Sequence, residues 1–194
     1  MPETFKRESK YGLTVLTTTD AGLLKYLQTV QQQISKWLID GHVQRLVVVV
    51  QGLDSQETLE RWQFNVSVEK KKNGAATTTA SSENQTPNFA RDDESSGKKS
   101  TMVGNKSIKD IHGEIQAIIR QITASVTFLP LLQEPCTFDL LVYTDKEVDA
   151  SDKWADSDPC YILNSAEVKL RSFTTSVHKV DSMVAYKEAE EWEL

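Results

Sequence analysis

Two runs of this sequence decide its fold: VQRLVVVV at residues 43–50 and RWQFNVSV at residues 61–68. The first run is almost continuously apolar and β-branched, which is typical of a central strand buried on both faces. Turn-forming residues, GLDS at 52–55, separate it from the second run. In that run Trp62 and Phe64 alternate with Arg61 and Gln63, a pattern that predicts a half-exposed strand.

One helix is predicted before these strands in the sequence, and a second one after them. Apolar residues with steps of three and four form one stripe at Leu23, Leu27, Val30, Ile34 and Trp37, and another at Ile108, Ile111, Ile115, Ile118 and Ile122. Asp20 and Ser107 are placed to cap the two helices at their N-termini, and Gly41 can end the first in a left-handed conformation.

Further strands are predicted in the second half of the chain. They are expected at 138–143, within 168–180 and at 183–186. The order is β-α-β-β, an insert, α and then β segments to the end. This order predicts an α+β fold in which helices pack on one mixed sheet.

Length and charge set the broad class of the protein. The 194 residues suit a single domain (1–194) with one sizeable core. Its net charge of −6 gives no general electrostatic reason to bind nucleic acid or an anionic membrane. No apolar run is long enough to cross a bilayer, and the first residues carry no secretory signal. We therefore expect no nucleic-acid and no membrane partner, and reduced thiols at Cys136 and Cys160.

Residues 69–106 differ sharply in composition from the rest. They are rich in Lys, Asn, Gly, Ala, Thr, Ser, Glu and Gln, and their only sizeable apolar residues are Phe89, Met102 and Val103. Such a segment cannot bury enough apolar surface to offset the entropy lost on ordering. We predict a disordered insert that joins two halves of one domain.

Little in the sequence indicates catalysis or metal binding. His42, His112 and His178 are far apart, and none belongs to a ligand pair. Cys136 has no catalytic signature around it, so a small buried thiol is the simpler reading, although a hydrolase that uses Cys136 and a histidine stays an alternative. No metal and no cofactor are expected.

Two places have the character of contact surfaces. Arg120 and Gln121 end the second helix, and the stretch that follows contains Phe128. This composition suits an interface, and equally a solvated helix end followed by core residues. The C-terminal third carries Trp154 in an acidic loop before further β segments, an arrangement that favours an exposed edge strand able to accept a peptide.

Six blocks of sequence resemble the spindle-checkpoint branch of the HORMA domain family. They are KYGLT at 10–14, LERWQF at 59–64, IRQITA at 119–124, VTFLPLL at 126–132, LRSFTT at 170–175 and SMVAYK at 182–187. The resemblance implies a HORMA fold, with helices on a mixed, mainly antiparallel sheet. It also implies a non-enzymatic binding protein that switches between an open and a closed state.

The resemblance further implies the sites of binding. The peptide-receiving strand would run from Phe138 to Tyr143, through Leu140, Leu141 and Val142. A mobile "safety belt" at 145–187 would close over the peptide. Belt or ligand-vicinity residues would be Trp62, Trp154, Arg171, Phe173, His178 and Tyr186. Arg120, Gln121 and Phe128 would form the surface through which an open and a closed copy dimerise.

The partners implied by the resemblance are proteins. They are a coiled-coil kinetochore anchor, the activator subunit of the anaphase-promoting complex, and an AAA+ remodelling ATPase acting with its HORMA adaptor. Capture of the activator would delay anaphase. The implied locations are the nucleus, the kinetochore and the cytoplasm.

Family members carry a long N-terminal helix before the segment that corresponds to residues 2–5. We expect that helix to be absent here, which would expose apolar surface. The alternatives to a checkpoint adaptor are a HORMA adaptor of DNA repair or of the meiotic chromosome axis, or a non-functional truncated form.

Overall fold

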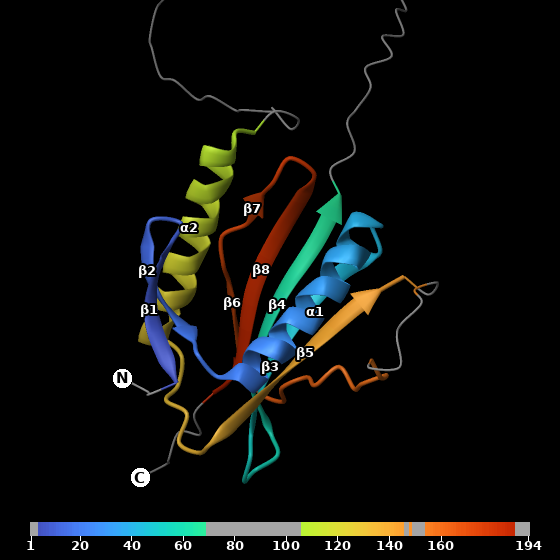
Figure 1. Cartoon of the computed structure of the whole chain (residues 1–194). Helices are drawn as coiled ribbons and strands as arrows, with labels where there is room; N and C mark the ends of the chain where they lie inside the picture. Colours follow the sequence, from blue (N-terminus) through green and yellow to red (C-terminus); the bar gives the residue numbers. More distant parts are fainter. Residues whose placement is uncertain (1–3, 69–105, 146–147, 149–153, 189–194) are drawn as a thin grey trace, which may run out of the picture.

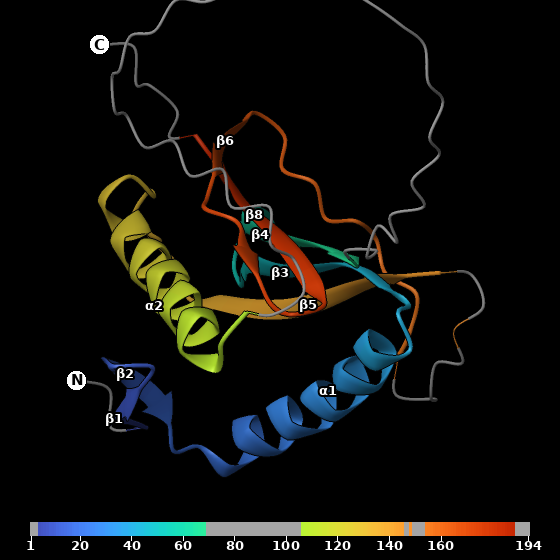
Figure 2. The same cartoon turned by 90° about the horizontal axis from the view of Figure 1, so that it is seen from above.

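A computed structural model describes residues 4–68, 106–145, 148 and 154–188 (Figure 1). Apart from Lys106, the predicted insert lies outside these residues. Two helices lie on one face of a six-stranded sheet, and Figure 2 shows both on that same side. The elements are β1 (Phe5–Lys10), β2 (Leu13–Thr18), α1 (Ala21–Ile39), β3 (Val43–Gly52), β4 (Thr58–Val68), α2 (Ile108–Ala124), a 3-10 turn (Ser125–Thr127), β5 (Cys136–Thr144), β6 (Ser165–Lys169), β7 (Phe173–Thr174) and β8 (His178–Lys187).

The main sheet has the strand order β5-β3-β4-β8-β6, with β7 also paired to β8. Every described pairing is antiparallel, so the mixed sheet expected from the sequence is antiparallel here. β1 and β2 form a separate hairpin. Its two-residue turn has positive φ at both Tyr11 (51°) and Gly12 (71°), the geometry of a type I′ turn, which explains the glycine.

Both predicted helices form, with the predicted caps. The Asp20 carboxylate accepts a hydrogen bond from the Leu23 N–H at 2.7 Å, and the Ser107 hydroxyl accepts one from the Asp110 N–H at 3.1 Å. Gly41 follows α1 with φ +79°, as the end of that helix requires. The caps thus set where both helices begin, and Gly41 sets where α1 ends.

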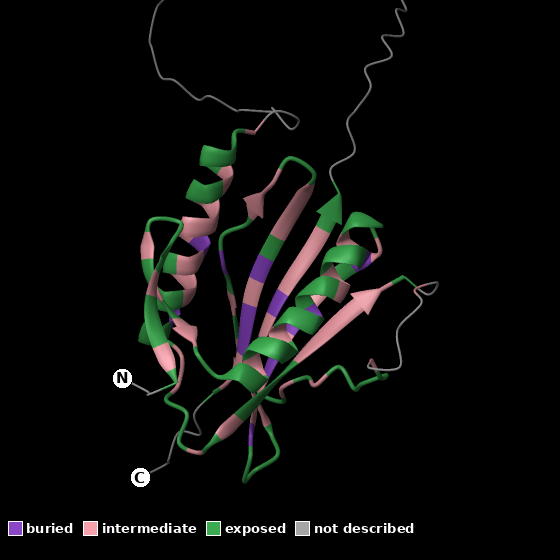
Figure 3. Cartoon of the chain, in the orientation of Figure 1, coloured by how far each residue is buried: buried purple, intermediate pink, exposed green. Residues whose placement is uncertain are grey.

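β3 is a central strand, as predicted, but the expected burial on both faces is incomplete. Val47 and Val49 are fully buried, whereas Val48 and Val50 on the helix side are half-buried. The helix side is therefore the less completely covered face of this strand. Figure 3 shows that the buried residues gather in the strands of the sheet and on the inner sides of the helices.

The prediction of a half-exposed β4, with its polar side chains toward solvent, is wrong. Arg61 is 5% and Gln63 is 8% exposed, while Trp62 and Phe64 are half-buried. A later segment of chain covers the polar face, which alternation within one strand cannot reveal. The expected break between 180 and 183 is also absent, because β8 runs through Asp181 and Ser182.

Candidate functional site

β5 is an edge strand of the sheet. It pairs with β3 along Val43–Gly52, and no other strand of the described residues pairs with it. Its outer row of backbone N–H and C=O groups is therefore available to another chain. The five residues predicted to receive a peptide all lie in this strand: Phe138, Leu140, Leu141, Val142 and Tyr143.

A groove of about 830 Å³ runs along this free edge. Its walls are α1 and residues 154–157, and its third side is β5. Tyr26 of α1 meets Phe138 edge-on, with ring centroids 6.3 Å apart, and Phe138 is 41% exposed. Burial, and then the charge of Asp139, raise the pKa of the Tyr26 phenol, so this tyrosine stays neutral. The groove combines apolar side chains with the carboxylates of Asp139 and Asp156.

Residues 154–164, here named the crossing segment, pass around the free edge of β5. At one end, Trp154 meets Trp37 of α1 on the helix side, with ring centroids 5.0 Å apart at 60°. Further along, Tyr161 packs under Arg61, with the guanidinium carbon 4.9 Å from the ring centroid. Arg61 pairs with Val49, and Val49 pairs with Asp139, so these side chains share the face opposite Phe138 and the helices.

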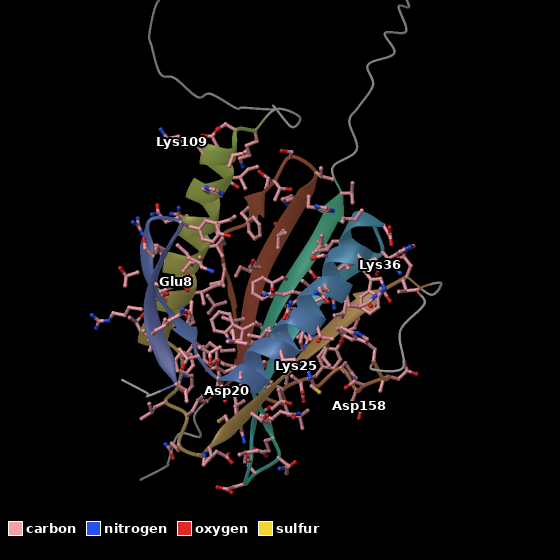
Figure 4. All side chains as sticks on the ribbon, viewed as in Figure 1. Glu8, Asp20, Lys25, Lys36, Lys109 and Asp158 are labelled. Atoms are coloured by element: carbon pink, nitrogen blue, oxygen red, sulfur yellow. The ribbon has the colours of Figure 1, made fainter. Side chains whose placement is uncertain are left out.

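The crossing segment therefore leaves the helix side at Trp154 and reaches the opposite side by Tyr161 (Figure 2). Figure 4 labels Lys25 on α1 and Asp158 in the crossing segment, both at the β5 side of the sheet. A strand added to β5 would lie inside the loop that the segment makes.

The remaining predicted belt residues lie away from the groove. Arg171, Phe173, His178 and Tyr186 belong to the β6–β8 side of the sheet. Trp62 is opposite Val184 of β8, and β3 separates its strand from β5. Its Nε1–H donates to Glu60 at 2.9 Å. Trp62 thus contacts the C-terminal strand and does not line the groove.

α2 fastens the chain between β6 and β8. The Gln121 side chain accepts a hydrogen bond from the Arg171 N–H at 2.7 Å. Glu114 accepts one from the Thr174 N–H at 2.7 Å and also pairs with Lys106. These contacts tie the region around β7 to the helix.

The three residues predicted for dimerisation lie close to the end of α2. Arg120 is exposed, and Phe128 is 39% exposed with its ring centroid 6.1 Å from that of Tyr186. Val126 and Leu131 nearby are 75% and 86% exposed. The structure therefore gathers an arginine and several exposed apolar side chains on one end of the molecule.

The two kinds of chemistry weighed from the sequence, a metal site and a reactive Cys136 thiol, find little support among the described residues. No group of three or more metal-ligating side chains occurs among them. The Cys136 thiol donates to the Glu134 carbonyl oxygen at 3.2 Å, and its pKa is raised by burial and then by the charges of Glu134 and Glu60. A raised pKa keeps the thiol protonated and weakly nucleophilic. Within the described part of the chain, neither helix has the length and apolarity needed to cross a membrane.

Sequence reasoning did not assign Trp37, Arg61 or Tyr161 to this site. Trp37 lies in the predicted apolar stripe of the first helix, and the alternation around Arg61 predicts an exposed face for it. The alternation shows only that Arg61 lies on the polar face of its strand. No local signal shows that residues 159–161 return to cover that face.

The comparisons with known proteins match this architecture. The HORMA domain family matches residues 2–178. The human mitotic spindle assembly checkpoint protein MAD2A is 50% identical over 185 residues, which are 95% of this chain and 78% of the human protein. The mitotic spindle checkpoint component mad2 of Schizosaccharomyces pombe is 40% identical over 186 residues, covering 95% of this chain and 79% of that protein.

Solved structures give the same result. A chain in the crystal structure of the mitotic checkpoint complex superposes with a TM-score of 0.74 at 37% identity, over 96% of this chain and 85% of that one. C. elegans HTP-2, bound to the HIM-3 closure motif, gives a TM-score of 0.64 over 96% of this chain and 80% of its own. At 13% identity, this second likeness concerns the fold alone.

Proposed function

The chain belongs to the HORMA domain family and is a homologue of the MAD2 spindle-checkpoint proteins, and from this we propose that it is a non-enzymatic checkpoint adaptor. In this proposal it captures a partner peptide as a strand added to β5, beneath a safety belt formed by residues 145–187. The belt would switch the protein between open and closed states.

One observation carries the proposal: the crossing segment passes around the outer edge of β5, an edge that no other described strand pairs with. Strand addition supplies main-chain hydrogen bonds along the free edge, and side-chain pockets add selectivity. Asp139 and Asp156 favour a basic residue in the ligand, and the apolar side chains of β5 favour an apolar pair. The crossing segment would then make dissociation slow.

The test uses a labelled peptide with a basic residue, an apolar pair and a downstream proline. Its release from the chain is followed against an excess of unlabelled peptide, and release over hours is expected. Two further peptides of the same sequence carry N-methyl groups on alternate amides, in opposite phases. Because only alternate residues of an added strand bond to the edge, one phase should lose binding and the other should keep it. Equal binding of both would refute strand addition.

The partners we propose are a coiled-coil kinetochore anchor and the activator of the anaphase-promoting complex, each through a short motif. An AAA+ ATPase with its HORMA adaptor would reopen the closed state. Action at the kinetochore, and in the nucleus and cytoplasm, follows from these partners. Support comes from the relatives named for the spindle checkpoint and from the match to a chain of the mitotic checkpoint complex.

We also propose that open and closed copies dimerise through Arg120, Gln121 and Phe128. Arg120→Glu should abolish self-association in sedimentation experiments and leave peptide capture unchanged. Lys109→Glu makes the same charge change at an exposed position at the other end of α2, and should leave both properties unchanged (Figure 4). Loss of capture together with self-association in Arg120→Glu would argue against a separate dimer surface.

A further inference from the structure

Arg61 is a buried cation that touches both β5 and the crossing segment. Its Nε–H donates to the Pro159 carbonyl oxygen at 3.2 Å, and its guanidinium lies over the Tyr161 ring. The same guanidinium donates to the Tyr143 hydroxyl at 3.4 Å and to the Gln63 amide oxygen at 2.7 Å. Only 5% of Arg61 is exposed, and no carboxylate of the described residues lies within ion-pair distance of it.

We infer that Arg61 is a positioning residue, a latch that holds the crossing segment closed around the edge of β5. The inference rests on the proposed function, because it concerns the rate at which a captured peptide is released. Tyr143 belongs to the edge strand and Pro159 to the segment, so one side chain joins the two parts that must separate.

The chemistry of arginine suits this role. A guanidinium is planar, presents donors in several directions and stacks on aromatic rings, so it can bond to Pro159, Gln63 and Tyr143 while it covers Tyr161. A lysine ammonium carries the same charge but cannot make this set of contacts at once.

The absence of a carboxylate partner within the described residues makes the latch reversible. A buried charge without a counter-ion is costly to desolvate, and among the described residues Arg61 is compensated by neutral acceptors and a ring alone. When the segment departs, the guanidinium regains water. The latch therefore holds through geometry, and a small loss of fit should open it.

Among the polar side chains that β4 places on this face, Gln63 bonds to the guanidinium directly. The Gln63 oxygen accepts from Arg61, while the Gln63 amide donates to Asn65 at 3.1 Å. Arg45 donates to the same Asn65 oxygen at 2.8 Å and lies over the Tyr143 ring at 5.2 Å. None of the contacts described for Arg45 involves the crossing segment. Arg45 is thus a matched control: an arginine on the same face that also contacts Tyr143 but has no described contact with the crossing segment.

The experiment compares Arg61→Lys with Arg45→Lys in the full chain. For Arg61→Lys we expect release of the labelled peptide at least tenfold faster, equivalent to about 1.4 kcal/mol. Amide hydrogen exchange should accelerate at residues 157–163 and stay unchanged in β3. Arg45→Lys should match the wild type in both measurements. Unchanged release and exchange in Arg61→Lys, or equal acceleration in both variants, would overturn the inference.

A second variant guards against misfolding of the first. Tyr161 is 66% exposed, so Tyr161→Leu removes the ring beneath Arg61 with little risk to folding. For Tyr161→Leu we expect release about threefold faster. In the double variant the increase in release rate should be smaller than the product of the two single increases, because both changes break the same interaction. Additive effects, or no effect of Tyr161→Leu, would count against the latch.

Failure of the proposed function would look different. If the wild-type chain captures no peptide, the adaptor proposal fails, while hydrogen exchange in the ligand-free chain still tests whether Arg61 holds the segment. If the wild type captures the peptide and both variants release it at the wild-type rate, the proposed function stands and the latch is wrong.

Discussion

Trp154→Ala should loosen the other end of the crossing segment. Trp154 is half-buried, and its ring meets that of Trp37 at 5.0 Å in an edge-on geometry. Trp37 is 4% exposed and belongs to the apolar side of α1, so it offers a fixed surface. This contact anchors the segment on the helix side of the sheet.

The size of the effect follows from burial and ring geometry. Full burial of a large apolar side chain contributes up to about 3 kcal/mol, so a half-buried one contributes roughly 1 kcal/mol. An edge-on aromatic pair adds about 1 kcal/mol beyond its buried area. Losing about 2 kcal/mol should accelerate release of a captured peptide roughly 30-fold, if the segment must leave first.

Competition with unlabelled peptide measures the rate directly. Trp154→Phe keeps an aromatic ring and should release the peptide at a rate between those of wild type and Trp154→Ala. Leu163→Ala is the matched control, because Leu163 lies in the same segment and is 86% exposed. A release rate for Trp154→Ala within threefold of the wild type would show that this contact does not hold the segment.

Two further predictions concern stability. Burial raises the pKa of Glu114, but hydrogen bonds from Lys106 and Thr174 lower it more, so the folded pKa lies below its ordinary value of 4.5. The stability that the ionised Glu114 contributes is complete above that value and is lost as the pH falls through the folded pKa. Between about pH 5 and pH 3, the free energy of unfolding should therefore fall less steeply in Glu114→Gln than in the wild type. Equal slopes of unfolding free energy against pH, measured by chemical denaturation, would refute this. The Ser182 hydroxyl is buried without a hydrogen-bond partner among the described residues, so Ser182→Ala should raise stability by about 1 kcal/mol, and a lower denaturation midpoint would contradict the reasoning.

The helices were predictable because local chemistry sets their limits. Asp20, Ser107 and Gly41 act within a few residues of the helix ends that they define. The strand β3 was predictable for a similar reason, because a run of β-branched apolar residues strongly favours a buried strand.

What the sequence could not reveal depends on distant segments. Whether the polar side of β4 faces water is decided by residues 159–161, almost a hundred positions away from Arg61. The free edge of β5 depends on β8 pairing with β4 instead. Strand composition alone does not determine which strand becomes the edge, and the resemblance to a family supplied that expectation.

The two anchors of the crossing segment lie on opposite faces of the sheet, and this arrangement bears on how release would occur. Trp154 is held on the helix side and Tyr161 on the other, with the free edge of β5 between them. A peptide whose flanks extend beyond the groove cannot slip out sideways and must wait until the segment moves. The release rate would then be a property of this chain more than of its ligand. Peptides with different affinities should therefore leave at similar rates and differ mainly in how fast they are captured.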